Sequence, residues 1–178
     1  YYPFCGNSND ISNNNRDLTN SGAVLTTDRN GNSNSAYYFD GASSYLESQS
    51  FPTNISSYTF SAWVKSYGFQ NDDGIVQQTG LTSSGGTGGS FGISCFNSKP
   101  NGRHRDNTFL LEAVNGNILN NNWIHLVSSW DGNNLLFYQD GNLVDSKIVT
   151  TSTSFLDIFR IGCVPVWYGS GCFSGSNF

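Results

Sequence analysis

The sequence predicts an all-β protein built as an antiparallel sandwich or barrel. Aromatic residues make up 15% of the chain and charged residues only 12%, a balance that suits strands better than long amphipathic helices. Short runs of alternating apolar and polar residues recur along the chain, and Asp-Gly or Asn-Gly pairs separate many of them. Such pairs are strong signals for tight turns between strands. Many short strands joined by frequent turns are typical of a sandwich or a barrel.

The expected strands follow one another from residue 35 to residue 163. They cover 35–40, 57–65, 91–96, 108–114, 123–130, 134–140 and 157–163. In the run 57–65, even-numbered residues from Tyr58 to Val64 point to one face, while Thr59, Ser61 and Trp63 point to the other. Residues 79–90 are small and Gly-rich, which predicts a mobile connection. No linker divides the chain, so residues 1–178 are expected to form one domain.

Charge and hydropathy exclude several function classes. The net charge is −5 and the eight Lys and Arg residues form no run, which argues against nucleic-acid binding. No apolar run is long enough to cross a bilayer, so membrane insertion is not expected. The chain begins at Tyr1 without an initiator Met, which suggests a processed product or a fragment. Its acidic, Asn-rich composition favours neutral sugars, Ca²⁺ or proteins as partners.

Four cysteines indicate two disulfides formed in an oxidising, extracellular compartment. Three pairings are possible for four cysteines. We favour Cys163 with Cys172, because the intervening residues can fold back as a hairpin or tight loop. Cys5 with Cys95 then remains by elimination.

Several segments resemble laminin G-like, concanavalin A-like jelly-roll domains, and they occur in the family's order. The stretch 123–144 resembles that family's core hairpin, with a Trp-x-His strand and a Tyr-x-Asp-Gly turn. Residues 1–12 resemble its opening strand, 26–47 its Asp-Arg-x-Gly to Phe-Asp-Gly segment, 58–65 its Phe-Ser-x-Trp-Val-Lys strand and 159–163 its late Ile-Gly strand. The resemblance implies a two-sheet jelly-roll sandwich. It does not imply one function, since the fold hosts lectins, adhesion modules, pentraxins and glycosidases.

The resemblance also implies one strand more than this sequence contains. In the family, a segment like 173–176 is followed by a last strand that lies against the first, whereas this chain stops at Phe178. A missing strand leaves unpaired backbone groups and an uncovered part of the core. Either a strand from another chain fills the gap, or the sequence is a piece of a longer polypeptide.

Catalysis is not expected. The glucanases of this fold carry a Glu-x-Asp-x-Glu strand, whereas Glu47 and Glu112 lie in different expected strands here. His125 is interpreted as a packed strand residue, and His104 as an exposed loop residue. Three strand tryptophans are expected in the core: Trp63, Trp123 and Trp130.

A calcium site is predicted in the N-terminal part of the chain. The stretch 28–34 offers side-chain oxygens at alternating positions, as calcium loops do. The candidate ligands share amide or carboxylate oxygens: Asp10, Asp28, Asn30, Asn32 and Asp40. The alternative is that these side chains bond to the backbone of their own turns.

Sugar binding requires an exposed aromatic platform beside hydrogen-bonding groups. Trp167 and Tyr168, in the loop before Cys172, are candidates for the platform, with Asn101 and Asn107 as polar partners. The alternative is that Trp167 covers the core. Asn54 begins an Asn-Ile-Ser pattern, which predicts N-glycosylation if the source organism glycosylates.

These observations favour a non-catalytic extracellular recognition or adhesion module that binds a glycan or a protein, with Ca²⁺ as a candidate cofactor. The alternative is a self-assembling subunit of an extracellular filament or surface layer, whose copies are joined by β-strand complementation.

Overall fold

A computed structural model describes residues 1–67, 74–81, 87–97, 99–105, 110–114, 116, 121–150, 155–163 and 174–177. Within these ranges the secondary structure is all strand, as the composition predicts. The strands are β1 (Thr19–Ser21), β2 (Val24–Thr26), β3 (Ala36–Asp40), β4 (Tyr45–Ser48), β5 (Tyr58–Lys65), β6 (Gly74–Leu81), β7 (Thr87–Phe96), β8 (Lys99–Arg105), β9 (Leu110–Ala113), β10 (Trp123–Trp130), β11 (Asn134–Gln139), β12 (Asn142–Ile148), β13 (Phe155–Ile161) and β14 (Ser174–Asn177).

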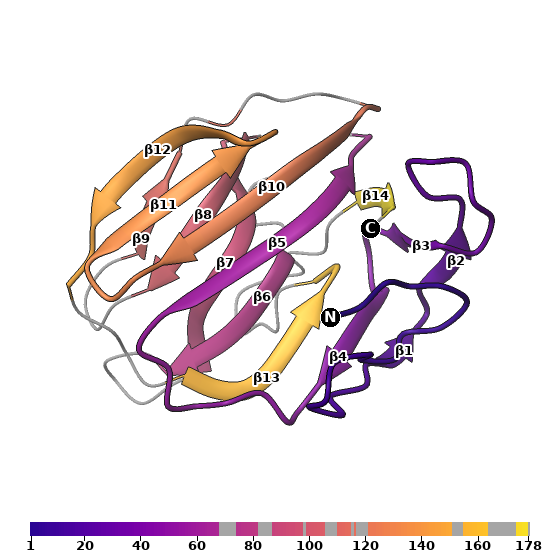
Figure 1. Cartoon of the computed structure of the whole chain (residues 1–178), viewed down its shortest axis with the longest axis horizontal. Coiled ribbons are helices and arrows are strands. Elements are labelled where there is room, and N and C mark those ends of the chain that lie inside the picture. The colour runs from indigo at the N-terminus through magenta and orange to yellow at the C-terminus, as the bar shows by residue number, and fades with distance from the viewer. Residues whose placement is uncertain are drawn as a thin grey trace.

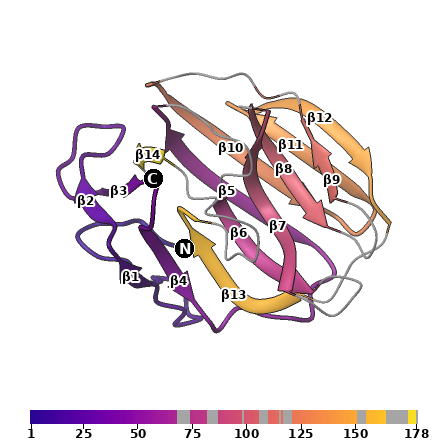
Figure 2. The ribbon, with the colours of Figure 1, turned by 180° about the vertical axis from the view of Figure 1, so that it is seen from behind.

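The strands form two packed layers (Figures 1 and 2). One layer is a seven-stranded sheet in the order β1-β4-β13-β6-β7-β8-β9. Against it lies a four-stranded sheet, β12-β11-β10-β5. A small sheet, β14-β3-β2, lies beside the end of β5, and β14 contacts β5 without pairing with it. Neighbouring strands run antiparallel, which confirms the predicted two-sheet sandwich.

The Asp-Gly pairs of the hairpin make turns, as their sequence predicts. Between β11 and β12, Asp140 and Gly141 both adopt positive φ, at 50° and 82°, as a two-residue turn of type I′ requires. Between β10 and β11, the Asp131 carboxylate accepts hydrogen bonds from the backbone N–H groups of Asn133 and Asn134. These turns set the register in which Leu126 lies opposite Gln139.

The core lies between the two layers and is rich in aromatic rings. Trp130 is buried and its indole N–H donates to the carbonyl of Val149 at 2.8 Å. His104 belongs to β8 and is fully buried, with ring centroids 4.4 Å from Trp130 and 4.9 Å from Phe91. The prediction of an exposed loop at His104 is therefore wrong. The Asn-Gly pair before it lies inside a strand, where Gly102 allows β8 to pass close to the opposite sheet.

Two further predictions differ from the structure. β6 extends to Leu81 and β7 begins at Thr87, so much of the expected connection at 79–90 is strand. Trp63 is not in the core, since 38% of its surface is exposed on the outer face of β5. Alternation places Trp63 on the correct face of the strand, but nothing in the described chain covers that face fully.

Candidate functional site

An unpaired strand edge crosses the middle of the molecule. Among the described strands, β5 is the last of its sheet and pairs only with β10. The Asp140 N–H donates to the His125 carbonyl at 2.8 Å, so odd-numbered residues of β10 direct their backbone groups towards β11. Even-numbered residues of β10 therefore bond to even-numbered residues of β5. It follows that Thr59, Ser61 and Trp63 direct their backbone N–H and C=O groups away from β10, towards the open edge.

A cavity of about 670 Å³ follows this edge. Its far wall is the N-terminal segment from Tyr1 to Phe4, so residues distant in sequence form its two sides. The cavity reaches both faces of β5, because no described strand continues the sheet there. We call its two parts the outer platform and the inner floor.

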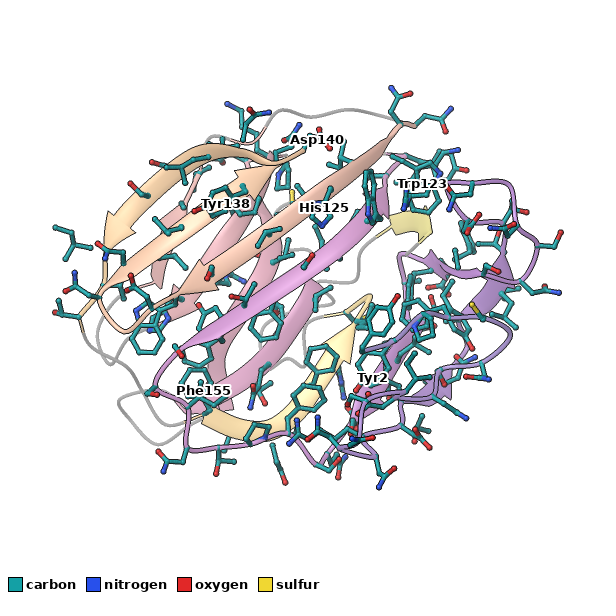
Figure 3. The ribbon with its side chains drawn as sticks, in the orientation of Figure 1. Tyr2, Trp123, His125, Tyr138, Asp140 and Phe155 are labelled. Atoms are coloured by element: carbon teal, nitrogen blue, oxygen red, sulfur yellow. The ribbon has the colours of Figure 1, made fainter. Side chains whose placement is uncertain are left out.

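The outer platform consists of Trp63, Trp123, His125, Ser61, Thr59 and Arg29. The rings of Trp63 and His125 stack with centroids 5.1 Å apart and an interplanar angle of 30°. His125 Nε2 lies 2.8 Å from the Ser61 hydroxyl, which fixes the orientation of the imidazole. The Arg29 guanidinium carbon lies 4.3 Å from the centroid of the Trp63 ring. The platform thus combines an exposed aromatic ring with several hydrogen-bonding groups. Figure 3 shows Trp123 and His125 along β10.

The inner floor is apolar. Phe60 and Ala62 point into the sandwich from β5, yet both remain only partly buried. Across the cavity, Phe159 of β13 stacks against Phe51 at 4.1 Å and, more loosely, against Tyr2 at 6.2 Å. Figure 3 shows Tyr2 beside β13. Residues that point inward are normally covered in a sandwich, so the floor is a part of the core that the described chain leaves open.

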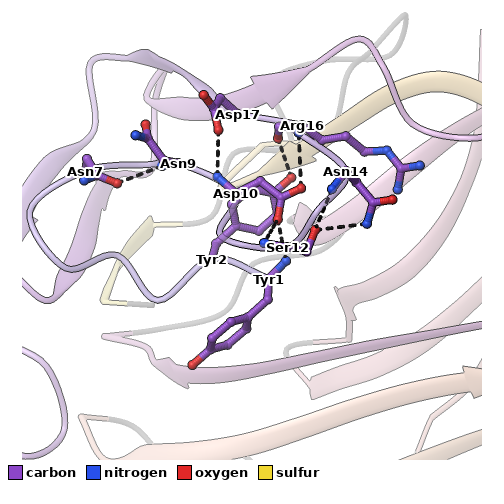
Figure 4. Close-up of polar contacts among 9 residues, drawn as sticks. All are labelled: Tyr1, Tyr2, Asn7, Asn9, Asp10, Ser12, Asn14, Arg16 and Asp17. Atoms are coloured by element: carbon purple, nitrogen blue, oxygen red, sulfur yellow. Dashed lines mark hydrogen bonds and ion pairs between the residues drawn. The ribbon is translucent and has the colours of Figure 1, made fainter.

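Three of the five predicted calcium ligands line the cavity: Asp10, Asp28 and Asn30. Asp10 Oδ1 accepts hydrogen bonds from the Tyr1 ammonium at 2.8 Å and the Ser12 N–H at 2.9 Å, while Oδ2 accepts from the Arg16 N–H (Figure 4). Burial raises the pKa of Asp10. These hydrogen bonds lower the pKa by more than burial raises it, so the pKa of Asp10 lies well below its usual range.

The remaining acidic candidates also bond to their own loops. The Asp28 carboxylate accepts hydrogen bonds from the backbone of Asn30 and from both the backbone and side chain of Asn32, and these lower its pKa. Asp40 caps the turn that follows it. No group of three or more His, Cys, Asp or Glu side chains is gathered as a metal site in the described ranges. Calcium binding stays a prediction.

The predicted sugar-binding residues are not brought together by the described structure. Trp167, Tyr168 and Asn107 lie outside the described residues. Asn101 is fully buried in β8, where its carbonyl oxygen accepts the Ser94 hydroxyl at 2.7 Å, rather than in an accessible loop. The aromatic platform lies instead at Trp63. The alternation in strand 57–65, which places Trp63 on the outer face, is the sequence signal that could have found it.

The disulfide predictions have different outcomes. Cys5 is exposed near the N-terminus whereas Cys95 is fully buried in β7, and the two do not form a disulfide, so this pairing is wrong. Pairing by elimination fails because burial in a sheet core separates the two side chains. Cys163 is disulfide-bonded, and its predicted partner Cys172 lies outside the described residues, so that pairing stays a prediction. Asn54 is exposed in the loop before β5, where the predicted glycosylation stays a prediction too.

Comparison with known proteins defines the class. A family model described as the concanavalin A-like lectin/glucanases superfamily matches residues 39–176. The chain therefore belongs to this superfamily, and it is a laminin G-like β-sandwich. No curated protein sequence matches the chain. No helix in the described residues is long and apolar enough to span a membrane.

Solved structures share the fold at low sequence identity. The binding domain of Paraclostridial Mosquitocidal Protein 1 matches with a TM-score of 0.66 and 15% identity, over 95% of this chain and 44% of that one. Domains LG4-5 of the mouse laminin alpha1 chain match with a TM-score of 0.58 and 13% identity, over 80% and 39% of the two chains. Domain 4 of AbnA, an extracellular arabinanase from Geobacillus stearothermophilus, matches with a TM-score of 0.54 and 16% identity, over 96% and 77%. The chain thus spans less than half of the first two structures.

Proposed function

We propose that the chain is a non-catalytic extracellular recognition module that binds a glycan on the outer platform. The observation that carries the proposal is the Trp63 ring, which is 38% exposed, lines the cavity and has His125 and Arg29 beside it. A sugar ring packs its apolar face on such an indole, and its hydroxyls bond to polar groups around it. Arg29 and the hydroxyls of Thr59 and Ser61 are the groups in place to do so.

The structural relatives support this class of function. The AbnA domain was solved in complex with arabinotriose, and a related binding domain, that of Botulinum Neurotoxin DC, in complex with SialylT. The second of these is a binding domain, and both share the fold of this chain. The coarser conclusion, a carbohydrate- or protein-binding domain, therefore agrees with the fold, and the outer platform is the place where we propose that binding occurs.

We include Ca²⁺ in the proposal as an assisting ion at the cavity rim. Its support is that Asp10, Asp28 and Asn30 line the same cavity as the outer platform. If calcium binds there, its addition raises the melting temperature and a chelator lowers it. A melting temperature that neither addition changes would remove calcium from the proposal.

The test of glycan binding is a glycan array followed by calorimetric titration of the best glycan. Trp63→Ala should weaken the binding of that glycan by about tenfold or more, since burying a large apolar side chain is worth about 1.5–3 kcal/mol. Leu143→Ala is the matched control, because Leu143 is also an exposed apolar strand residue, 55% exposed on β12 at the other edge of the sheet. Equal affinities of the two variants, or no glycan bound on the array, would contradict the proposal.

A second candidate is a self-assembling subunit whose copies complement one another's sheets. The observation that favours it is that β12 has an unpaired edge in the described part of the chain, with Ile148 76% exposed on it. Light scattering over a wide concentration range tests it. A monomer that persists at high concentration would exclude this candidate.

A further inference from the structure

The open edge of β5 is bounded like a slot for one strand. The cavity along this edge measures about 670 Å³. β5 forms one side of it and the segment from Tyr1 to Phe4 the other. Thr59, Ser61 and Trp63, whose backbone groups face the open edge, all line it. A strand paired with β5 would lie about 4.8 Å from it, on the cavity side.

The two faces of the slot differ in chemistry. A strand placed beside β5 continues its alternation, so every second side chain of that strand points inward. Inward side chains meet the inner floor, where Phe60 and Ala62 are only partly buried and Phe159 lines the cavity. Outward side chains meet the outer platform. The slot therefore selects a segment with apolar residues at alternate positions.

Charge adds a second requirement. The Arg29 guanidinium lies over the Trp63 ring and forms no ion pair with a described carboxylate. Its neighbour Asp28 already bonds to Asn30 and Asn32. A carboxylate on an outward position of the incoming strand would meet this arginine in a bidentate pair. Arg16, which also lines the cavity, lies over the Phe51 ring at 5.4 Å and lacks a described carboxylate partner as well.

We infer that the β5 edge is an acceptor site for an extended peptide segment of a partner protein, with alternating apolar residues and an acidic outward residue. Backbone hydrogen bonds to Thr59, Ser61 and Trp63 supply affinity, and the inner floor and Arg29 supply specificity. The edge strand of a second folded copy does not fit this slot. It would bring its own neighbouring strand into the space of the segment from Tyr1 to Phe4, which forms the far wall. This inference deepens the protein-binding side of the proposed function, and the bound strand would lie beside Trp63 and Arg29 of the outer platform.

The experiment selects ligands from a phage-displayed library of random peptides and then measures the best synthetic peptide by calorimetry. We expect apolar residues at alternate positions and an acidic residue between them. Ser61→Pro removes one N–H from the open edge, and the ladder to β10 keeps its bonds because Ser61 does not contribute to it. Affinity should fall roughly tenfold or more, since an acceptor of the peptide is left unpaired. Ser61→Ala, which keeps the N–H and loses the hydroxyl, should bind within about threefold of the wild type.

Hydrogen exchange provides a readout that does not depend on the variants. The amides of Thr59, Ser61 and Trp63 should exchange quickly in the free monomer and slow by at least tenfold when the peptide binds. Three results would overturn the inference: no selected peptide, equal binding by Ser61→Pro and Ser61→Ala, or protection of these amides in the free monomer. Protection that rises with protein concentration, together with dimers in light scattering, would assign the slot to a second copy instead. Ser61→Pro and Ser61→Ala both lose the hydroxyl, so a difference between these two variants reports on the strand site alone, whereas loss of glycan affinity in Trp63→Ala reports on the outer platform. Failure of one proposal is therefore distinguishable from failure of the other.

Discussion

Asp40 tests whether the acidic residues of the N-terminal part are turn caps or metal ligands. Its Oδ1 accepts the backbone N–H groups of Ala42, Ser43 and Ser44 at 2.9, 3.0 and 3.0 Å, and the Ser44 hydroxyl at 2.8 Å. The backbone donors of Ser43, Ala42 and Ser44 hold the pKa of Asp40 well below its usual range. This geometry is that of a loop stabilised by one ionised carboxylate, and it needs no ion.

Asp40→Asn keeps a carbonyl oxygen in place and removes the charge. Hydrogen bonds to charged groups contribute about 1.5–3 kcal/mol, and solvent around the exposed Asp40 reduces this, so we expect a loss of about 1–2 kcal/mol at neutral pH. The folded pKa is depressed, so the charged form contributes its full stability above the unfolded pKa of about 3.9. That contribution is lost as pH falls towards the folded pKa. The wild type should therefore approach the variant in stability at low pH.

The assay is urea unfolding of both proteins at about pH 7 and about pH 2.5, with equal m-values as the check on two-state behaviour. Asp157→Asn is the control, because Asp157 is exposed and its carboxylate makes no described hydrogen bond; it should change stability by less than about 0.5 kcal/mol. A difference for Asp40→Asn that is the same at both pH values would refute the capping argument. A loss that appears only in the presence of calcium would show that Asp40 acts through a bound ion.

Three further changes test the packing. Gly162→Ala should destabilise by about 2–5 kcal/mol in urea, since φ is +94° and the new methyl overlaps a buried phenylalanine ring; Gly141→Ala, with φ at +82° and open space around it, should cost only about 1–2 kcal/mol, and equal losses would contradict this account. Tyr58→Phe removes a hydroxyl that donates to the Arg103 carbonyl at 3.1 Å and lies 3.1 Å from His104 Nδ1, so it should cost about 1–3 kcal/mol; no loss of stability would contradict this account. Cys5 should react with a thiol reagent in the native protein and Cys95 only after unfolding, whereas equal rates would contradict their burial.

Local pattern was sufficient for the fold and for much of the sheet. Alternation in 57–65 correctly divides the residues of β5 between the two faces, and the Asp-Gly pairs correctly mark the hairpin turns. The local pattern did not predict correctly which side chains are buried. Trp63 is exposed because the residues that would cover it are set by which strands neighbour β5, and a periodic pattern carries no information about neighbours.

His104 shows a second limit of sequence reasoning. Asn101-Gly102 reads as a turn because both residues favour turns, but glycine also permits close approach between packed sheets. A side chain at Gly102 would meet the Ser128 hydroxyl, so here the second reason applies and His104 enters the core. No local sequence pattern could predict the cavity, because its two sides, Tyr1–Phe4 and the strand that begins at residue 58, are far apart in the sequence.

The two proposed ligands would share β5, and this sharing has a consequence for their affinities. A strand bound at the open edge covers the inner floor and places its outward side chains beside Trp63 and Arg29, while the outer platform itself remains on the surface. An acidic residue paired with Arg29 withdraws one hydrogen-bond donor from a bound sugar. Each ligand should therefore reduce the binding affinity of the other by the same factor, because coupling between two binding equilibria is reciprocal. Replacing the acidic residue of the peptide by its amide should relieve this competition. Competition that persists with the amide would instead mean that the two ligands overlap in space at Trp63.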